Sequence, residues 1–322
     1  MAELLRQYSA RRTLSGACPA VAAALVASAH PAAAAEASAA AERFAPEFAG
    51  YGELIRNRRG DLAGFMTRGE DGDFAERVRD QLLELEAPEE ALRQQARWLA
   101  MLGPGRTFLK LEWQAAPGGT PSRLAALYVR RRLPVADVVA LITAAAEGTL
   151  PTGHFHTLAR LLGKETVHFI ALACRPGEPV HYKLYFSQLQ EVANREAVQV
   201  RLGRALEHFA PHREAVARWA AYHDRLAPSG PERTLFVSLA MTRDGVQPSI
   251  KIDYPEVAPD VAVAVLDVVE QQPAAEGFAD LCGRAGCERL SFLGLRLGLG
   301  AVPVLKGYAD FPHERFPGSA FP

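Results

Sequence analysis

The sequence predicts an α+β protein built from repeated αββα units. Apolar segments occur in pairs along the chain, with helical segments between the pairs. Each pair is joined by a short turn rich in Gly, Pro or Asp, which is the pattern of a β-hairpin. The returning strand of each pair carries a cation, at intervals of roughly 55 to 70 residues, which is longer than the period of most solenoid repeats. These cations are Arg123, Lys183, Lys251 and Lys306.

The N-terminal region has two interpretations. Arg11 and Arg12 precede an Ala-rich tract that runs to Ala41, which resembles an export signal of a secreted protein. Pro19 and His30 interrupt this tract, and alanine is the best helix former. We therefore expect a pair of packed helices here, and a cytoplasmic protein rather than an exported one.

The remaining elements follow in order. The expected hairpins span residues 107–128, 167–186, 234–254 and 290–308. Helical periodicity and helix-start signals predict helices over residues 74–102, 134–146, 157–162, 188–226, 260–271 and 277–285. Residues 312–322 contain three prolines and no period, which predicts coil. We expect a single domain, with an N-terminal helical part over residues 1–100 and the αββα repeats over residues 101–322.

The composition is that of an ordinary globular protein. The chain has 322 residues, of which 49% are hydrophobic and 23% charged, so it can bury a large core. The net charge of −1 gives no footprint for nucleic acid or an anionic membrane, so any anion must be bound by a local cluster of cations. The four cysteines form no metal signature and fit a reducing compartment. No apolar run is long enough to span a bilayer.

The strand His181–Phe186 carries the first functional signal. Side chains alternate along a strand, so His181, Lys183 and Tyr185 share one face, and the opposite face is apolar. An unpaired charge is costly to bury, so Lys183 must face water or a cavity. His181 is the one histidine that we place in a site.

The cations of the four returning strands are the second signal. If the hairpins close into a barrel, alternation puts one face of every strand inside. The four cations could then converge and repel one another unless an anion neutralised them, which predicts a polyanionic ligand such as a diphosphate. The alternative is that these side chains point outward from exposed positions near the turns.

Aromatic and acidic side chains accompany these cations. Tyr185, Tyr254 and Tyr308 could line a cavity and stabilise a carbocation through their ring faces, although tyrosine also favours strands in general. Glu112 shares a face with Lys110 and could accept a proton from an electron-rich ring, or form an ion pair on an exposed face.

Several motifs are absent from the sequence. There is no Asp-Asp-x-x-Asp motif, P-loop, GxGxxG after a strand, HExxH or GxSxG. Protein cations, rather than a carboxylate-bound magnesium cluster, would therefore have to hold a diphosphate. We expect no metal and no cofactor.

These residues resemble the aromatic prenyltransferases of the ABBA fold, most of all their dimethylallyl-tryptophan-synthase branch. The family's Lys-x-Tyr-Phe strand is matched by Lys183-Leu184-Tyr185-Phe186. Its Pro-x-x-Lys-x-Tyr-x-Pro strand, which leads into a helix that begins with Asp, is similar to Pro248–Pro255 and Asp260. Its last hairpin is similar to Ser291-Phe292 with Lys306-Gly307-Tyr308. The resemblance covers residues from about 105 to 311.

The resemblance implies a PT barrel of ten antiparallel strands with helices outside and the active site within. It implies metal-independent transfer of a prenyl group in secondary metabolism, from dimethylallyl or geranyl diphosphate to an indole, a phenol or an aromatic residue of a peptide. The implied diphosphate ligands are Arg123, Lys183, Lys251 and Lys306. The implied shielding residues are Tyr185, Tyr254 and Tyr308, with Glu112 as proton acceptor.

The sequence departs from the family pattern in three places. The family's catalytic Glu follows Pro-Phe, whereas Leu109 follows Thr107-Phe108 here. Tyr254 is displaced by one residue, so Asp253 shares a face with Lys251. Four hairpins are recognisable where the family has five, and the fifth lies either in residues 189–202 or in the first hundred residues. A non-catalytic barrel that binds a prenyl diphosphate or another anionic small molecule is the alternative function.

Overall fold

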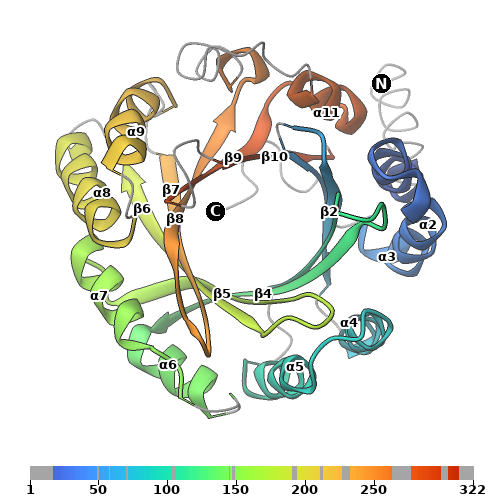
Figure 1. The fold of residues 1–322 in the computed structure, drawn as a ribbon, viewed down its shortest axis with the longest axis horizontal. Coiled ribbons are helices and arrows are strands. Elements are labelled where there is room, and N and C mark those ends of the chain that lie inside the picture. The colour runs from blue at the N-terminus through green and yellow to red at the C-terminus, as the bar shows by residue number, and fades with distance from the viewer. Residues whose placement is uncertain are drawn as a thin grey trace, which may run out of the picture.

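Ten antiparallel strands form a closed barrel in the described part of the chain, with helices on its outer surface (Figure 1). The computed structural model describes residues 17–48, 51–57, 59–69, 72–102, 106–144, 146, 149–190, 194–210, 213–226, 233–262, 277–298 and 304–311. The strands follow the order β1-β10-β9-β8-β7-β6-β5-β4-β3-β2, so neighbours in sequence are neighbours in the barrel. The expected α+β barrel with outer helices is confirmed.

The strands pair as consecutive hairpins. Their bounds are β1 Gly52–Asn57, β2 Leu62–Gly69, β3 Arg106–Gln114, β4 Ser122–Pro134, β5 Thr166–Cys174, β6 His181–Gln190, β7 Arg233–Thr242, β8 Gly245–Val257, β9 Leu290–Leu297 and β10 Val304–Asp310. The four hairpins expected from the sequence are all present. Pairing of Leu54 with Ala309 joins β1 to β10 and closes the cylinder.

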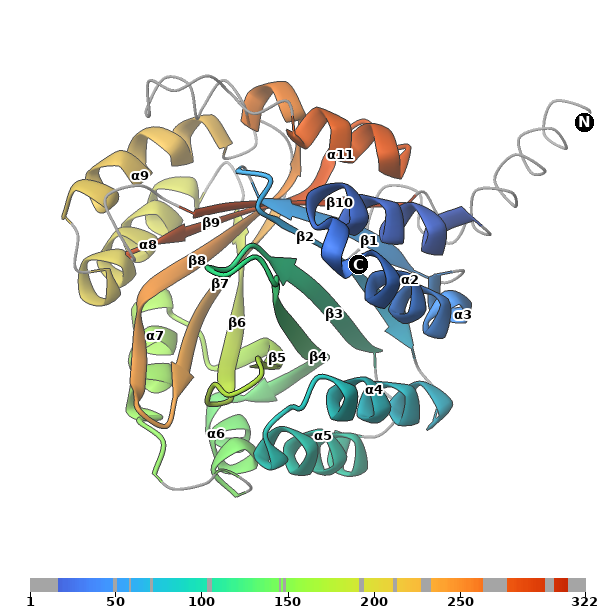
Figure 2. The same cartoon turned by 45° about the vertical axis from the view of Figure 1, so that its right-hand side comes forward.

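Helices between the hairpins cover the barrel from outside (Figure 2). Residues 17–29 are helical. Further along are η1 Pro31–Ala33, α2 Ala34–Arg43, α3 Ala45–Phe48, α4 Gly72–Glu84, α5 Glu89–Leu102, α6 Val135–Thr143, α7 Gly153–Leu162, α8 Arg195–Phe209, α9 Arg213–Leu226 and α11 Gly277–Ala285. The outward strand face packs against these helices, as shown by Leu54, Phe65 and Leu127, which have no exposed surface. Burial of this apolar layer is the main force that holds helices to barrel.

The fifth hairpin, β1–β2, lies in the first hundred residues. The expectation that residues 1–100 form a helical part is therefore wrong for residues 52–69. Glycines and charges conceal these strands in the sequence. Gly64 is required by packing, because a Cβ atom there would lie 2.2 Å from the carbonyl oxygen of Leu111 on β3.

The helical expectation for residues 188–226 also needs correction. Strand β6 continues to Gln190, and two helices follow, separated near Ala210, whose backbone is extended. Helix α6 begins after Pro134 as expected but ends at Thr143. Residues 259–262 are helical, while the rest of the expected helix at 260–271 and the expected coil at 312–322 lie outside the described residues.

Candidate active site

Strand register brings five cations onto the inner face of the barrel. Lys110 on β3 pairs with Met66 on β2, and Lys183 on β6 pairs with Ala171 on β5. Because side chains alternate, the same inward face continues around the closed sheet. The cations that meet in one cavity, named here the cationic cavity, are Lys110, Lys183, Lys251, Arg296 and Lys306.

Two buried carboxylates neutralise only part of this charge. Glu112 lies 3.0 Å from the Lys110 nitrogen and 2.8 Å from the Lys306 nitrogen. Asp253 lies 2.5 Å from Lys251. Burial lowers the pKa of Lys110, but Glu112, followed by Tyr308 and Tyr185, together outweigh burial and raise this pKa above its usual range. Five cations against two carboxylates leave a surplus of positive charge.

Lys183 contributes to this surplus because no carboxylate among the described residues forms an ion pair with it. Its side chain is buried. Burial and the nearby charges of Lys110 and Arg296 hold its pKa well below the usual range. Burial also lowers the pKa of Lys306 to about 7. Both groups would regain their charge if an anion entered the cavity, so the cavity favours a polyanion.

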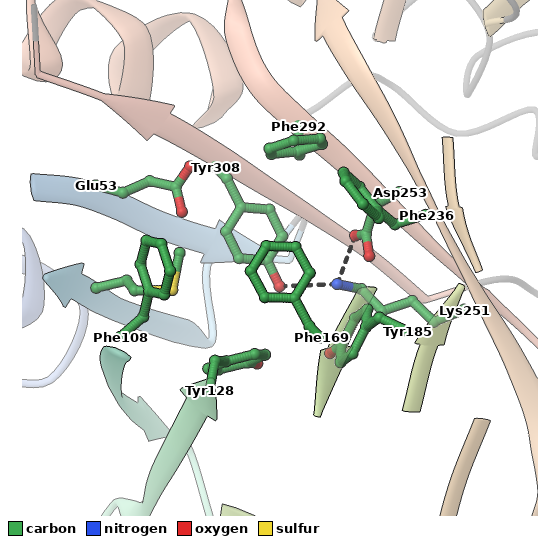
Figure 3. Close-up of a pocket in the computed structure, with 11 residues that line it drawn as sticks. Glu53, Phe108, Tyr128, Phe169, Tyr185, Phe236, Lys251, Asp253, Phe292 and Tyr308 are labelled. Atoms are coloured by element: carbon green, nitrogen blue, oxygen red, sulfur yellow. Dashed lines mark hydrogen bonds and ion pairs between the residues drawn. The ribbon is translucent and has the colours of Figure 1, made fainter. Parts of the chain in front are cut away.

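A chamber of aromatic rings, drawn in Figure 3, shares lining residues with the cationic cavity. This aromatic chamber is lined by Glu53, Met66, Phe108, Tyr128, Phe169, Tyr185, Phe236, Lys251, Asp253, Phe292 and Tyr308. Neighbouring rings touch, with centroids 5.5 Å apart for Phe169 and Phe236 and 5.8 Å apart for Phe236 and Phe292. The chamber is thus mainly apolar, although the charged side chains of Glu53, Lys251 and Asp253 also line it.

Tyr185, Tyr308 and Lys251 line both spaces and so form the boundary between them. The Lys251 nitrogen lies 4.8 Å from the centre of the Tyr308 ring and donates a hydrogen bond to its hydroxyl. The Tyr185 ring lies 5.7 Å from Tyr128. Burial raises the pKa of Tyr308 well above its usual value, so the phenol is neutral. Neutral ring faces at this boundary can stabilise a positive charge.

Two residues expected in the site, Arg123 and Tyr254, have side chains that face outward from the barrel. Arg123 pairs with Trp113 on the outward face, and its guanidinium lies 3.3 Å from Glu36 on α2. Tyr254 is buried under α9, where its hydroxyl accepts a hydrogen bond from Trp219. Strand alternation explains both placements, because each residue has the opposite parity to the inward residues of its strand. The expectation that they share the interior with Lys183 is wrong.

Arg296 and Lys110 were not among the expected diphosphate ligands, although both line the cationic cavity. Alternation along Leu290–Leu297 puts Phe292, Gly294 and Arg296 on one face, which is a signal that sequence analysis could have used. Gly294 leaves room for a neighbour, because a Cβ atom there would lie 2.6 Å from Cε of Lys251.

Glu112 is poorly suited to accept a proton. It contacts lysines of the cationic cavity and does not line the aromatic chamber. Although its burial raises the pKa, Lys110 and Lys306 outweigh burial and hold this pKa well below the usual range. A carboxylate with so low a proton affinity is a weak base.

Glu53 on β1 lies in the aromatic chamber instead. Its carboxylate is fully buried, and one oxygen accepts a short hydrogen bond from the Ser291 hydroxyl. Burial, with the nearby charge of Asp310, raises the pKa of Glu53 well above its usual value. The sequence alone does not point to Glu53, because glycines and charges conceal the β1–β2 hairpin on which it lies.

His181 lies on the inward face at the start of β6. Its Nδ1 is 3.0 Å from the Gln247 side-chain nitrogen, and its Nε2 is 3.8 Å from Glu178. Burial and the charge of Lys183 lower the pKa of His181 to about 4, so the ring is neutral at pH 7. In the described ranges, no group of three or more His, Cys, Asp or Glu side chains could hold a metal ion. None of the described helices has the length and apolarity of a membrane span.

Comparison with known proteins identifies the fold. No family model and no curated protein sequence matches the chain. Solved structures do match, among them prenyltransferase PriB in a ternary complex with L-tryptophan and dimethylallyl thiolodiphosphate, with a TM-score of 0.61 and 13% identity over 94% of this chain and 99% of that one.

Two further matches are similar in kind. The 6-dimethylallyltryptophan synthase from Micromonospora olivasterospora has a TM-score of 0.55 and 15% identity, over 80% of each chain. AnaPT from Neosartorya fischeri has a TM-score of 0.57 and 11% identity, over 80% of this chain and 77% of that one. The chain therefore has the barrel fold of these prenyltransferases, as the sequence motifs led us to expect.

Proposed function

We propose that this barrel is a metal-independent aromatic prenyltransferase, which transfers a dimethylallyl or geranyl group from its diphosphate to an electron-rich arene. The observation that carries the proposal is the junction of the two interior spaces. A buried excess of cations adjoins a chamber of aromatic rings, at a boundary shared by Tyr185, Lys251 and Tyr308. One substrate that is anionic at one end and apolar at the other would fill both spaces.

The diphosphate is assigned to the cationic cavity. Lys183 and Lys306 have depressed pKa values and regain charge beside an anion, while Lys110, Lys251 and Arg296 complete the shell. As the bond between the allylic carbon and the diphosphate oxygen breaks, negative charge grows on the leaving group. Fixed cations in a site shielded from water stabilise that charge more in the transition state than in the ground state.

The allylic cation is assigned to the boundary between cavity and chamber. Tyr185 and Tyr308 line this region, Tyr128 contacts Tyr185 from the chamber, and all three phenols are neutral. They would shield the cation from water, so that the arene is the nucleophile that captures it.

Glu53 is assigned as the proton acceptor in place of Glu112. After the arene carbon attacks the allylic cation, the ring must lose a proton to become aromatic again. Glu53 lines the chamber in which the arene would lie, and its raised pKa gives it the proton affinity that a general base needs. The acceptor would be an indole, a phenol or an aromatic residue of a peptide.

Incubation with dimethylallyl or geranyl diphosphate and a panel of indoles, phenols and aromatic peptides, with a metal chelator present, tests the proposal. Release of diphosphate together with a prenylated arene is expected. Tight binding of the diphosphate without any product across the panel would instead support a non-catalytic binding protein.

A further inference from the structure

Two carboxylates lie side by side at the seam that closes the barrel. Glu53 on β1 and Asp310 on β10 are directly opposite partners in the antiparallel ladder. Partners of this kind have Cβ atoms about 4.5–5.5 Å apart. Glu53 points into the aromatic chamber (Figure 3), and Asp310 lies two residues beyond Tyr308, which lines the same chamber. Strand alternation therefore gives both carboxylates the inward direction.

The hydroxyl of Ser291 on β9 lies between these carboxylates. It donates a short hydrogen bond to one oxygen of Glu53 and lies 2.9 Å from the carbonyl oxygen of Tyr308. Burial raises the pKa of Asp310, and hydrogen bonding by the same hydroxyl opposes this rise. A hydroxyl has one proton to donate, so it cannot serve all these acceptors at once. The cluster therefore lacks one donor until a carboxyl group takes up a proton.

Burial makes the repulsion between the two charges strong. Glu53 has no exposed surface, and its pKa is raised first by this burial and then by the charge of Asp310. Two carboxylates that share a buried site resist full ionisation and titrate as a pair. The fully ionised pair is thus a stronger base than an isolated carboxylate, because the first proton that it accepts relieves the repulsion.

Other titratable groups surround the pair. Lys251 lowers the pKa of Glu53 and Asp253 raises it, so these two neighbours act in opposite directions. Of the charges that act on Glu53, that of Asp310 has the largest effect. The titratable groups near one or both carboxylates are Tyr51, Arg68, Lys251, Asp253, Glu256, Cys282, Cys287 and Tyr308.

We propose that Asp310 and Ser291 are positioning residues of the proton-transfer step, and that Glu53 and Asp310 act together as the acceptor of a single proton. This inference rests on the proposed function. When the C–H bond of the prenylated ring breaks, its electron pair restores the aromatic ring and its proton forms an O–H bond with Glu53. The neutral carboxyl group then supplies the donor that the cluster lacked, and Asp310 keeps the remaining negative charge.

The pH dependence of kcat/KM for the arene, at saturating prenyl diphosphate, tests the role of Asp310. Asp310→Asn should move the rise in kcat/KM to lower pH, because Glu53 loses its negative neighbour. The plateau of kcat should also fall, since the base is weaker, but by less than the 10²–10⁴-fold typical of losing a general base. A lower plateau with the rise at its wild-type pH would indicate a structural role only and would overturn the proposal.

The second variant is expected to act in the opposite direction. Ser291→Ala removes a hydrogen bond that favours the ionised carboxylates, so the rise in kcat/KM should move to higher pH. Movement of the rise in the same direction in Ser291→Ala and Asp310→Asn would contradict the assignment. Asp310→Glu keeps the charge and should keep the rise near its wild-type pH.

Asp280→Asn is the matched control. Asp280 lies on α11, which packs against β1 and β10, but its carboxylate pairs with Arg56 and Arg284 on the outside of the barrel. The substitution removes one carboxylate close to the seam without touching the pair. Its pH profile should match that of the wild type, and a shift as large as that of Asp310→Asn would show that the effect is not specific to the pair.

A measurement without turnover separates this inference from the proposed function. The side-chain carboxyl signal of Glu53, in protein labelled with ¹³C-glutamate, is identified by its absence from Glu53→Gln and followed by NMR as pH changes. It should titrate at lower pH in Asp310→Asn than in the wild type. That result without any prenylated product would support the coupled pair and refute the proposed function. Prenylation with an unmoved Glu53 titration would refute the pair and leave the function in place.

Discussion

Glu112 and Lys306 are 194 residues apart in the chain, yet their side chains form an ion pair inside the barrel, with both carboxylate oxygens of Glu112 within 2.9 Å of the lysine nitrogen. Lys110 lies 3.0 Å from the same carboxylate. This arrangement makes Glu112 a holder of two lysines at the cationic cavity. It also holds the pKa of Glu112 well below its usual range, which disfavours a role as general base.

Glu112→Gln should therefore affect stability and diphosphate binding before it affects proton transfer. Removing one partner from a buried ion pair typically costs about 3–5 kcal/mol. We expect a lower midpoint in urea unfolding, which inorganic diphosphate restores by a larger increment than in the wild type. An unchanged midpoint, with activity abolished, would return Glu112 to the role of proton acceptor.

Glu53→Gln should reduce kcat about 10²–10⁴-fold, the usual contribution of a general base. Calorimetric affinity for diphosphate should stay at the wild-type value, because Glu53 does not line the cationic cavity. In the wild type, kcat/KM should rise with pH as Glu53 ionises, and this rise should occur above the usual range of a carboxyl group because its pKa is raised. The pH-dependent rise should disappear in Glu53→Gln.

Lys183→Met should weaken diphosphate binding by at least about tenfold, since it removes a charge-assisted contact. The substitution should leave stability equal or higher without ligand, because the folded state no longer has to bury this group. Arg123→Met is the matched control, a cation on a returning strand that pairs with Glu36 outside the barrel. Isothermal titration of both variants decides the point, and equal losses would contradict the assignment of Lys183.

Lys306 should make diphosphate binding depend on pH. Its pKa is about 7 in the free protein, and a bound anion would raise it, so binding takes up a proton above pH 7. Affinity should then fall as pH rises above 7, by at most about tenfold per pH unit for one proton. Calorimetry at pH 8 in buffers of different ionisation enthalpy measures the uptake. Lys306→Gln should remove this part of the dependence, leaving only that of the ligand and the other groups.

The same lysine has a consequence for stability. The usual pKa of lysine is about 10.4 in an unfolded chain. Because the folded value is lower, the unfolded state binds more protons between about pH 7 and 10, so the contribution of Lys306 to the free energy of unfolding rises with pH over that range. Urea unfolding at pH 7 and pH 9 should show a smaller change in Lys306→Gln than in the wild type.

The sequence was sufficient to predict which side chains of one strand share a face. Alternation alone places Lys183 with Tyr185, and it separates Lys251 from Tyr254. The position of Arg123 was not predictable in this way, because the sequence does not say which parity of β4 faces inward. That choice depends on pairing with β3, where Trp113 opposite Arg123 packs in the outer core.

The β1–β2 hairpin could not be recognised from the sequence, because tertiary contacts explain the residues that form it. Gly64 interrupts a strand pattern, and only the close approach of Leu111 on β3 explains it. From the sequence, Glu53 would be expected on the surface, because acidic side chains are usually exposed. Only the closed barrel shows that it faces the interior. Glu53 could not be proposed as the proton acceptor from the sequence, since a buried carboxylate is recognisable only once the residues around it are placed.

The seam between β1 and β10 joins the first and the last of the described strands, with Glu53 opposite Asp310. A nascent polypeptide cannot make this seam until its final strand has left the ribosome. Up to that moment the interior is open to water, and the lysines that later crowd together remain solvated. Such distant pairing predicts slow folding. A truncated chain that lacks β10 would lose Lys306 and Tyr308 and would expose two unpaired sheet edges, which makes it prone to aggregate.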